Sequence, residues 1–389
     1  MKRGFNTRAV QEGEFRDRRV GNVTTPIFET STFFNPNPEP QAYIDHTRNE
    51  PFMYTRWGNP TLQSLEAKYA SLDSVDSALS FSSGMGAITT VMLSFLRKGD
   101  RILAIRELYG ETFLFFSRFL PTMGVEVDFV GLDKLNSGEI DIRGYAAVYA
   151  ESIVNPTLGV SDIRLLGRMC QEEGVPLVID ATFASPYNQN PFLMGADFVL
   201  HSGTKYIGGH SDIVLGLAGF GRESMKEVWT RRRMLGTSPD PLQAYLGLRG
   251  LKTLGLRMEA HNRNALAVAR FLEGNSKVKR VYYPGLESSP YNPIAKRNMK
   301  AFGGVVSFVP KGDLETARRI ARNVKVFSYA PSLGGVESLL TIPLETAHSN
   351  LKPEERKSAG IEDSLIRLSV GIEDEEDLIG DLEEALERA

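Results

Sequence analysis

Short apolar segments alternate with helical segments through the first half of the chain, and this alternation strongly constrains the fold. Strands are expected at 78–81, 101–105, 125–130, 146–150, 175–180 and 196–201. Helices are expected between them, at about 62–72, 88–96, 110–123 and 163–173. Apolar strands that alternate with helices predict an α/β fold, in which a mostly parallel sheet is covered by helices on both faces.

Polar side chains follow several of these strands at the point where each strand ends. They are Ser83, Tyr109, Glu151, Asp180 and Lys205. Ligands of such sheets bind beyond the carboxyl ends of the strands. We therefore expect these five side chains to share one edge of the sheet and to form a site there.

Lys205 lies in the stretch His201-Ser-Gly-Thr-Lys-Tyr-Ile-Gly-Gly-His-Ser-Asp212. A desolvated lysine loses its charge readily and can form a Schiff base with an aldehyde. Upstream, Ser82-Ser83-Gly84 leads from a strand into a helix, whose first N–H groups favour an anion such as a phosphate. A surface lysine in a glycine-rich turn and an ordinary strand-to-helix turn are the plain alternatives.

The chain is expected to have three parts. Residues 1–60, rich in Pro, Asn, Thr and Phe, predict an extended arm. Residues 61–248 carry the alternating pattern and form the large domain, and residues 249–389 form a smaller α+β domain. Further elements are expected as one long helix over 242–272, strands over 278–283, 304–309 and 324–327, and helices over 314–322 and 374–387.

Composition excludes several classes of function. The net charge is −3 without a basic stripe, so no nucleic-acid partner is expected. No apolar run is long enough to span a membrane, and the first residues lack the apolar segment of a signal peptide. Cys170 is the only cysteine, which excludes an intrachain disulfide and fits a cytoplasmic location. No metal is expected, and structural roles are expected for His201, His210, His261 and His348.

The sequence resembles the pyridoxal phosphate (PLP)-dependent enzymes of Cys/Met metabolism, which include cystathionine γ-synthase, cystathionine γ-lyase, cystathionine β-lyase and methionine γ-lyase. The resemblance covers essentially the whole chain. Besides 201–212, it is carried by Tyr54-Thr-Arg56, Asn59-Pro-Thr61, Ser82-Ser-Gly-Met85, Leu108-Tyr-Gly110, Asn155-Pro-Thr157, Asp180-Ala-Thr-Phe-Ala-Ser-Pro186, Ser332-Leu-Gly-Gly-Val-Glu-Ser338 and Arg367-Leu-Ser-Val-Gly-Ile-Glu373. It implies the aminotransferase-like fold of type I PLP enzymes.

The resemblance also implies how PLP is held. Lys205 would carry the cofactor through a Schiff base and shuttle protons, and Asp180 would pair with the pyridine nitrogen. Thr182 would support the ring. The phosphate would be bound by Gly84, Met85, Ser202 and Thr204.

Other roles follow from the same resemblance. Tyr54 and Arg56 would reach the phosphate of a neighbouring subunit, which makes the enzyme a dimer at least and, as is usual in this family, a homotetramer. Tyr109 would stack on the ring and transfer protons near the leaving group. Arg367 would bind the substrate α-carboxylate, with Asn155 and Ser332 nearby.

Several residues bear on the reaction. Leu333 replaces the tryptophan typical of β-lyases, and Glu337 in Gly-Gly-Val-Glu-Ser favours a cystathionine enzyme. Against this, Gly84-Met-Gly-Ala-Ile-Thr89 is more like methionine γ-lyase, and Leu114 falls where the cystathionine enzymes usually have an arginine. Glu111 is a further departure, and its carboxylate either binds a substrate ammonium group or faces solvent.

These observations favour a trans-sulfuration enzyme that acts at Cγ, of the cystathionine γ-synthase or γ-lyase type. Its substrate would be a sulfur amino acid or O-acylhomoserine. Methionine γ-lyase and O-acylhomoserine sulfhydrylase are the alternatives within the family. A PLP-fold binding subunit without catalysis is the alternative outside it, and the intact Lys205, Asp180, Tyr109 and Arg367 argue against that reading.

Overall fold

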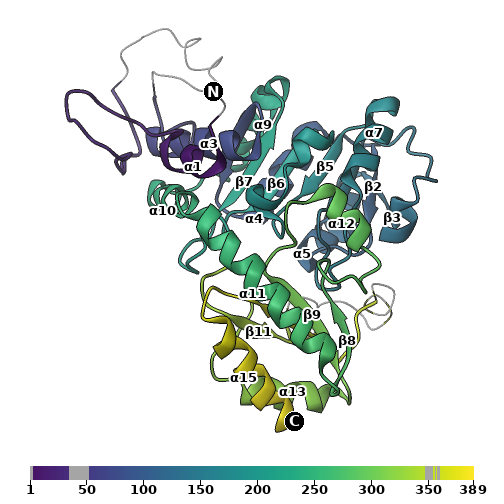
Figure 1. The fold of residues 1–389 in the computed structure, drawn as a ribbon. Helices are drawn as coiled ribbons and strands as arrows, with labels where there is room; N and C mark the ends of the chain where they lie inside the picture. The colour runs from purple at the N-terminus through teal and green to yellow at the C-terminus, as the bar shows by residue number, and fades with distance from the viewer. Residues whose placement is uncertain (1–2, 35–51, 347–353, 355, 357–359) are drawn as a thin grey trace.

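The computed structural model describes residues 3–34, 52–346, 354, 356 and 360–389. It contains two sheets, one in the upper half of Figure 1 and one in the lower half. The expected arm at 1–60 therefore lies partly outside the described residues, and so does His348.

The larger sheet has seven strands in the order β1-β7-β6-β5-β4-β2-β3. The strands are β1 (Ser77–Phe81), β2 (Arg101–Ile105), β3 (Glu126–Val130), β4 (Ala147–Glu151), β5 (Leu177–Asp180), β6 (Phe198–Ser202) and β7 (Gly216–Phe220). All neighbouring pairs from β6 to β3 are parallel, and β7 is antiparallel to both β1 and β6. The mostly parallel α/β sheet expected from the sequence is thus confirmed.

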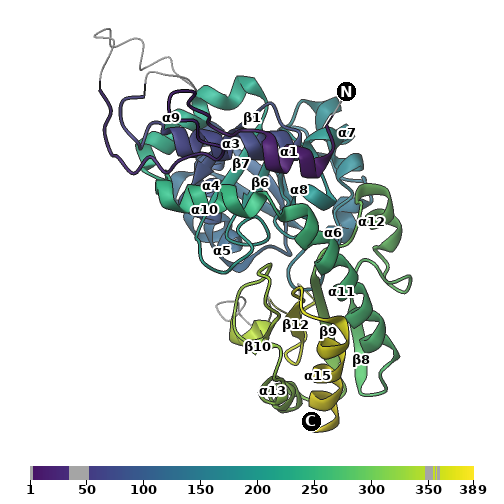
Figure 2. The same cartoon turned by 60° about the vertical axis from the view of Figure 1, so that its left-hand side comes forward.

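Helices cover this sheet, as Figures 1 and 2 show. Every residue of β1, β4 and β7 is buried, because apolar strands between two layers of helices have no solvent-facing side. The helices of this half are α3 (Pro60–Asp73), α4 (Gly84–Phe95), α5 (Gly110–Leu114), α6 (Leu132–Asn136), α7 (Ile163–Glu173), α8 (Ser185–Asn188), α9 (Met225–Leu235) and α10 (Pro241–Leu251).

The segment expected as one helix over 110–123 changes type along its length. After α5 the chain forms a π-helix at Phe115–Phe119 and a 3-10 helix at Leu120–Met123. Pro121 has no N–H to donate, and Gly124 ends the segment in a left-handed conformation at φ 76°. Further 3-10 turns lie at Pro191–Met194, Arg222–Ser224 and Pro343–Glu345.

The smaller sheet has five strands in the order β10-β11-β12-β9-β8. They are β8 (Val278–Tyr282), β9 (Val305–Pro310), β10 (Ser328–Tyr329), β11 (Leu339–Thr341) and β12 (Ile366–Ser369). Helices α11 (Leu254–Gly274), α13 (Leu314–Asn323) and α15 (Glu375–Glu387) pack with this sheet, whereas α12 (Asn292–Asn298) packs on the larger half, where Ala295 is buried in its core. The sequence did not predict β11 and β12, and β12 carries Arg367.

The expected single helix over 242–272 is wrong, because the chain breaks between α10 and α11 at Lys252 and Thr253. The break lets the Arg257 guanidinium donate to the Gly250 carbonyl at 2.7 Å and to the Tyr206 carbonyl at 2.6 Å. Through these bonds Arg257 holds the start of α11 against the turn that follows Lys205.

The expected strand at 324–327 is also wrong. Its N–H groups donate to a side chain instead of a neighbouring strand: the Asp381 carboxylate accepts from Lys325 at 2.6 Å, Val326 at 2.9 Å and Phe327 at 3.0 Å. Because Asp381 lies on α15, this contact ties the last helix of the chain to the loop before β10.

Helix α11 joins two hydrophobic cores. Leu254 and Met258, in its first half, are buried in the core of the larger sheet, and Val268 and Leu272 are buried in the core of the smaller one. The domain boundary expected at residue 248 falls within α10, immediately before this connection.

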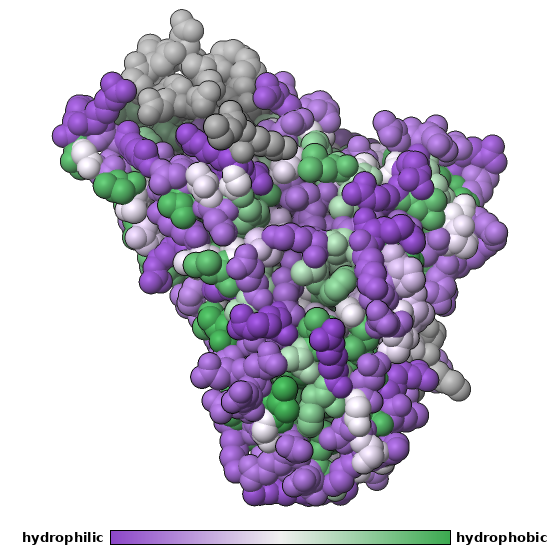
Figure 3. Space-filling model, viewed as in Figure 1, coloured by the Kyte–Doolittle hydropathy of each residue, from purple (hydrophilic) through white to green (hydrophobic). Residues whose placement is uncertain are grey.

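The N-terminal arm begins with a helix, α1 (Phe5–Gln11), that packs on α3. The Glu14 carboxylate forms an ion pair with the buried Lys68 amine at 3.3 Å, which fixes the arm to the larger half. Figure 3 shows mainly hydrophilic side chains on the visible face, with apolar ones scattered among them. Among the described helices, none combines the length and apolar character needed to cross a bilayer.

Candidate active site

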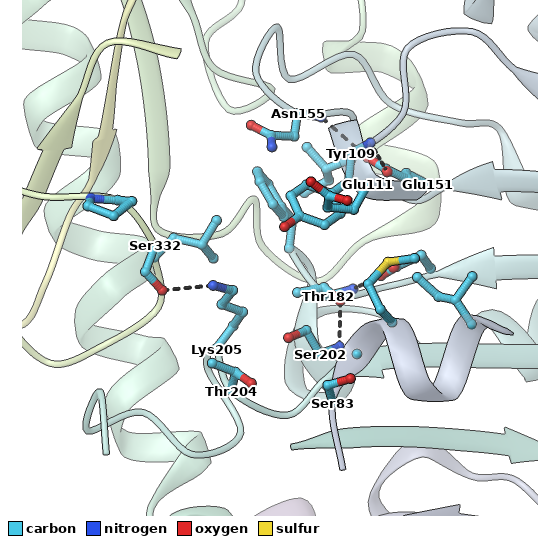
Figure 4. A pocket seen from close by; sticks show the side chains of 18 of the residues that line it. Ser83, Tyr109, Glu111, Glu151, Asn155, Thr182, Ser202, Thr204, Lys205 and Ser332 are labelled. Atoms are coloured by element: carbon cyan, nitrogen blue, oxygen red, sulfur yellow. Dashed lines mark hydrogen bonds between the residues drawn. The ribbon is translucent and has the colours of Figure 1, made fainter. Parts of the chain in front are cut away.

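A cavity of about 650 Å³ is lined by residues of both halves. Its walls come from the carboxyl ends of β4, β5 and β6, the start of α4 and α5, the loop before β11, and β12. Twelve of the residues predicted from the sequence line it: Gly84, Met85, Tyr109, Glu111, Asn155, Asp180, Thr182, Ser202, Thr204, Lys205, Ser332 and Arg367. Figure 4 shows ten of the lining residues with labels.

Lys205 lies three residues after the end of β6, and its side chain points into the cavity (Figure 4). The amine donates a hydrogen bond to the Ser332 hydroxyl at 2.7 Å. Burial lowers the pKa of Lys205 to about 8, and the positive charge of Arg367 contributes to this shift. About a tenth of the amine is therefore neutral at pH 7, far more than for a free lysine, and a nucleophile or a base must be neutral.

Arg367 lies on β12 and is only 3% exposed. It donates to the Asn155 side-chain oxygen at 2.9 Å and to the Ser332 carbonyl at 2.8 Å. Its Nε is buried without a partner among the described residues. Burial lowers the pKa of Arg367 to about 10, yet the guanidinium stays charged at neutral pH. A buried cation with a spare donor suits a carboxylate ligand.

Ser332 has a backbone φ of 90°, in the left-handed region that serine rarely adopts. Its hydroxyl faces Lys205, and its carbonyl accepts from Arg367. Strain of this kind gathers at functional sites, where the surrounding structure holds it in place.

Asp180 ends β5, is half-buried and lines the cavity. Burial raises its pKa, while hydrogen bonds from Thr182, including the backbone N–H at 2.9 Å, oppose the increase. His201 also lowers the pKa of Asp180, and the His201 ring contacts Asp73 at 3.1 Å. A cation placed against Asp180 from the cavity would stabilise its charged form.

The start of α4 forms the other end of the cavity. Ser83 caps the helix by accepting a hydrogen bond from the Gly86 N–H at 2.9 Å. A Cβ on Gly84 would lie 2.9 Å from the Ser202 Cβ, so only glycine fits this close approach. Unpaired N–H groups at a helix start are suited to a phosphate. The Thr204 hydroxyl already accepts from the Leu215 N–H at 3.0 Å and donates to its carbonyl at 3.3 Å.

Tyr109 precedes α5 and is 40% exposed, with its ring in the cavity (Figure 4). Burial raises the pKa of the Tyr109 hydroxyl, and the nearby Glu111 carboxylate raises it further. The phenol is therefore protonated at neutral pH in this chain alone and is able to donate a proton.

Known proteins with this fold decide the family. A model of the family described as Cys/Met metabolism PLP-dependent enzyme matches residues 6–387. The chain belongs to this family. A cystathionine gamma-lyase of Dictyostelium discoideum is 41% identical over 386 residues, covering 99% of this chain and 98% of the relative. An L-methionine gamma-lyase of Fusobacterium nucleatum subsp. polymorphum is 40% identical over 391 residues, covering 100% and 99%.

Solved structures agree with this assignment. The crystal structure of metB from Corynebacterium glutamicum has a TM-score of 0.92 and 36% identity, and the match covers 99% of this chain and 98% of the other. The type I PLP-enzyme fold predicted from the sequence is therefore confirmed, and PLP is the cofactor of this enzyme family.

The cavity fits PLP. The Lys205 amine has a lowered pKa, as attachment to an aldehyde requires, and the same cavity is lined by the Asp180 carboxylate, as a pyridinium nitrogen requires. The start of α4 supplies N–H groups for a phosphate beside the glycine that permits close contact.

Tyr54 and Arg56 lie outside this cavity. They line a second cavity of about 410 Å³ with Glu29, Ser238 and Asp240. The Arg56 guanidinium donates to the Arg233 carbonyl at 2.6 Å and lies 5.5 Å from the Tyr54 ring centroid. Within one chain these residues do not join Lys205, and their service to a neighbouring subunit stays a prediction.

Glu337 and Leu114 do not line the cavity around Lys205 either. The Glu337 carboxylate accepts a hydrogen bond from the Ser211 hydroxyl, and Leu114 ends α5. Of the two residues singled out on α5 for substrate choice, only Glu111 reaches the cavity wall.

Glu151 and Ser83 were expected at the same sheet edge, and both line the cavity, although the sequence assigned no role to Glu151. Apolar wall residues were missed as well, because an isolated apolar side chain has no local pattern that marks it as lining a site. They include Ile88, Ile153, Phe183 and Val214, whereas Leu333 had been singled out from the sequence.

Proposed function

We propose that this enzyme catalyses γ-elimination or γ-replacement on sulfur amino acids or O-acylhomoserine, as a cystathionine γ-synthase or γ-lyase does. One observation carries the proposal: the Lys205 amine and the Arg367 guanidinium meet on Ser332. An amino acid whose carboxylate binds Arg367 would therefore present its Cα near a base.

Arg367 would bind the substrate α-carboxylate through its spare Nε–H, with Asn155 and Ser332 fixing the guanidinium plane. Lys205 would then remove the Cα proton with its neutral amine, whose pKa is already lowered to about 8. Bound PLP supplies an electron sink that stabilises negative charge developing on the substrate.

Tyr109 would act further along the substrate. Its hydroxyl is protonated because burial and Glu111 raise its pKa, so it can give a proton to a leaving group at Cγ. The apolar Leu333 and Phe183 would keep water from this part of the cavity.

The remaining cofactor contacts are proposed on the same basis. Asp180 would hold the pyridine nitrogen and Thr182 would support the ring. Gly84, Met85 and Ser202 would bind the phosphate, and Thr204 would do so only beside its existing bonds to Leu215.

The choice among family reactions stays open. Methionine γ-lyase is the second candidate, because Leu114 replaces the usual arginine of the cystathionine enzymes and suits a smaller substrate. O-acylhomoserine sulfhydrylase is the third. Glu337 is proposed either to contact the substrate directly or to support the wall of the site through its hydrogen bond with Ser211.

We further propose a cytoplasmic homotetramer, built from dimers in which Tyr54 and Arg56 complete the partner's phosphate site. Exposed Tyr54, at 42%, and the separate cavity around Arg56 support a role outside their own chain. We also propose that each chain is divided into a large domain at 61–248 and a small domain at 249–389.

A substrate panel tests the reaction. The purified enzyme is given cystathionine, methionine, or O-acylhomoserine with and without cysteine, and 2-oxobutanoate and cystathionine are measured. A cystathionine γ-lyase should form 2-oxobutanoate from cystathionine, and a cystathionine γ-synthase should form cystathionine from O-acylhomoserine and cysteine. Preference for methionine would move the assignment to the second candidate, and a protein that takes up no PLP and turns over none of these would refute the proposal.

A further inference from the structure

We propose that Glu151 is a positioning residue, whose single carboxylate holds the turn of Tyr109 and the turn of Asn155 at a fixed separation. The inference rests on the proposed function, because it assumes that both turns contact substrate or cofactor. It assigns a task to a buried acid that the reaction outlined above does not use.

Glu151 is the last residue of β4 and lies beside Asp180 on β5. Its Oε1 accepts the Tyr109 backbone N–H at 2.6 Å, and its Oε2 accepts the Asn155 backbone N–H at 3.4 Å. Both bonds are drawn in Figure 4. One side chain thus joins two segments that are 46 residues apart in the sequence, from Tyr109 to Asn155.

The carboxylate is costly where it lies. Glu151 is 4% exposed, and burial together with the neighbouring Asp180 and Glu107 carboxyls raises its pKa. None of these main influences is a cation. A buried acid without a counter-ion destabilises the folded state unless its hydrogen bonds compensate. An acid is therefore expected at this position for the bonds that it makes.

Each bond controls a different part of the site. The Tyr109 N–H lies just before α5, where no helix carbonyl can accept it. By accepting this N–H, Glu151 fixes the backbone position from which the Tyr109 side chain extends. The Asn155 side-chain oxygen accepts from Arg367 at 2.9 Å, so Glu151 also fixes the support of the proposed carboxylate clamp. The proton-donating ring and the clamp are consequently set at one spacing.

Three variants test this in the PLP-loaded enzyme. Glu151→Gln keeps one acceptor oxygen but turns the other position into a donor, so it keeps one of the two bonds. Glu151→Ala removes both. Glu107→Gln is the matched control, because Glu107 is a half-buried acid with a raised pKa that also accepts a backbone N–H, from Leu132 at 3.1 Å, but does not line the cavity.

We expect Glu151→Gln to lower kcat/KM about tenfold and Glu151→Ala about 100-fold, since the first variant loses one of the two hydrogen bonds and the second loses both. The circular dichroism of bound PLP should change in both variants, because the Tyr109 ring shifts. Substitution of an acid with a merely structural role would lower the melting temperature but leave the circular dichroism of PLP, kcat and KM unchanged. We expect this result for Glu107→Gln.

Wild-type kcat, KM and PLP circular dichroism in Glu151→Gln would overturn the inference. If the alanine variant does not fold, the glutamine variant decides alone. Failure of the proposed function has a different signature, because the wild-type protein itself would then neither take up PLP nor act on the substrate panel.

Discussion

Ser332 accepts a hydrogen bond from the Lys205 amine at 2.7 Å while its carbonyl accepts from Arg367. One residue with a strained backbone thus brings the Lys205 amine beside the Arg367 guanidinium. The same proximity explains part of the lowered pKa of Lys205, since the Arg367 charge disfavours a second cation nearby.

The pKa of Lys205, lowered to about 8, predicts how the apoenzyme captures PLP. Only the neutral amine attacks the aldehyde, and it becomes scarce about tenfold per pH unit below its pKa. The capture rate should therefore rise with pH to about 8 and then level off. Stopped-flow absorbance measures it, and a rate that still climbs at pH 9.5 would show an ordinary lysine.

Arg367→Gln supplies the control for that experiment. Burial and the Arg367 charge both lower the pKa of Lys205. Removing the charge should therefore raise the pH at which the capture rate is half-maximal, but not to the pKa of a free lysine, because burial remains. An unchanged midpoint would mean that burial alone sets the pKa of Lys205.

Arg367→Ala should raise KM for amino-acid substrates by about 100-fold with a smaller change in kcat. Truncating one partner of a buried, hydrogen-bonded charge pair costs roughly 2–5 kcal/mol. Steady-state kinetics measure the effect. Arg280→Ala is the matched control, because Arg280 is an exposed arginine on β8 of the same sheet, and equal KM values for the two variants would contradict the clamp.

Mixing subunits tests whether Tyr54 and Arg56 complete a partner's site. Arg56→Ala and Lys205→Ala should each be inactive, and refolding them together should restore roughly a quarter of wild-type activity if two chains share each site and assort at random. Lys205 and Asp180 line the same cavity of one chain. Mixing Lys205→Ala with Asp180→Ala therefore leaves one defect in every site and should restore no activity. Equal recovery in the two mixtures would exclude sharing.

Glu111→Gln separates the two readings of this cavity carboxylate. If Glu111 binds a distal ammonium, the substitution should raise KM for cystathionine up to about fivefold, since an exposed ion pair is worth about 1 kcal/mol or less. KM for methionine, which has no second amine, should stay constant. If the substitution changes KM by the same factor for both substrates, the carboxylate faces solvent.

The residues at strand ends could be predicted from sequence because topology alone brings them together. Asp180 and Lys205 follow apolar strands, and parallel strands place their carboxyl ends on one edge. Arg367 was different. It lies on the four-residue β12, too short for a clear alternating pattern, so only the family resemblance singled it out.

Long-range side-chain contacts account for the failures. The Asp381 carboxylate captures three N–H groups more than 50 residues away, and Arg257 captures the Gly250 and Tyr206 carbonyls. Local periodicity records neither contact, so it predicted a strand in one place and an unbroken helix in the other. Glu151 shows the same limit, because its backbone partners leave no mark in the sequence.

The two sheets contribute different groups to the cavity. Lys205, Asp180 and Tyr109 follow strands of the seven-stranded sheet, whereas Arg367 lies on the five-stranded one and Ser332 precedes its strand β11. If these groups act as proposed, inherited changes in the smaller half can alter how the substrate carboxylate is held while the groups around the cofactor stay intact. Such a division would let mutations tune substrate binding in one half without disturbing the cofactor chemistry of the other.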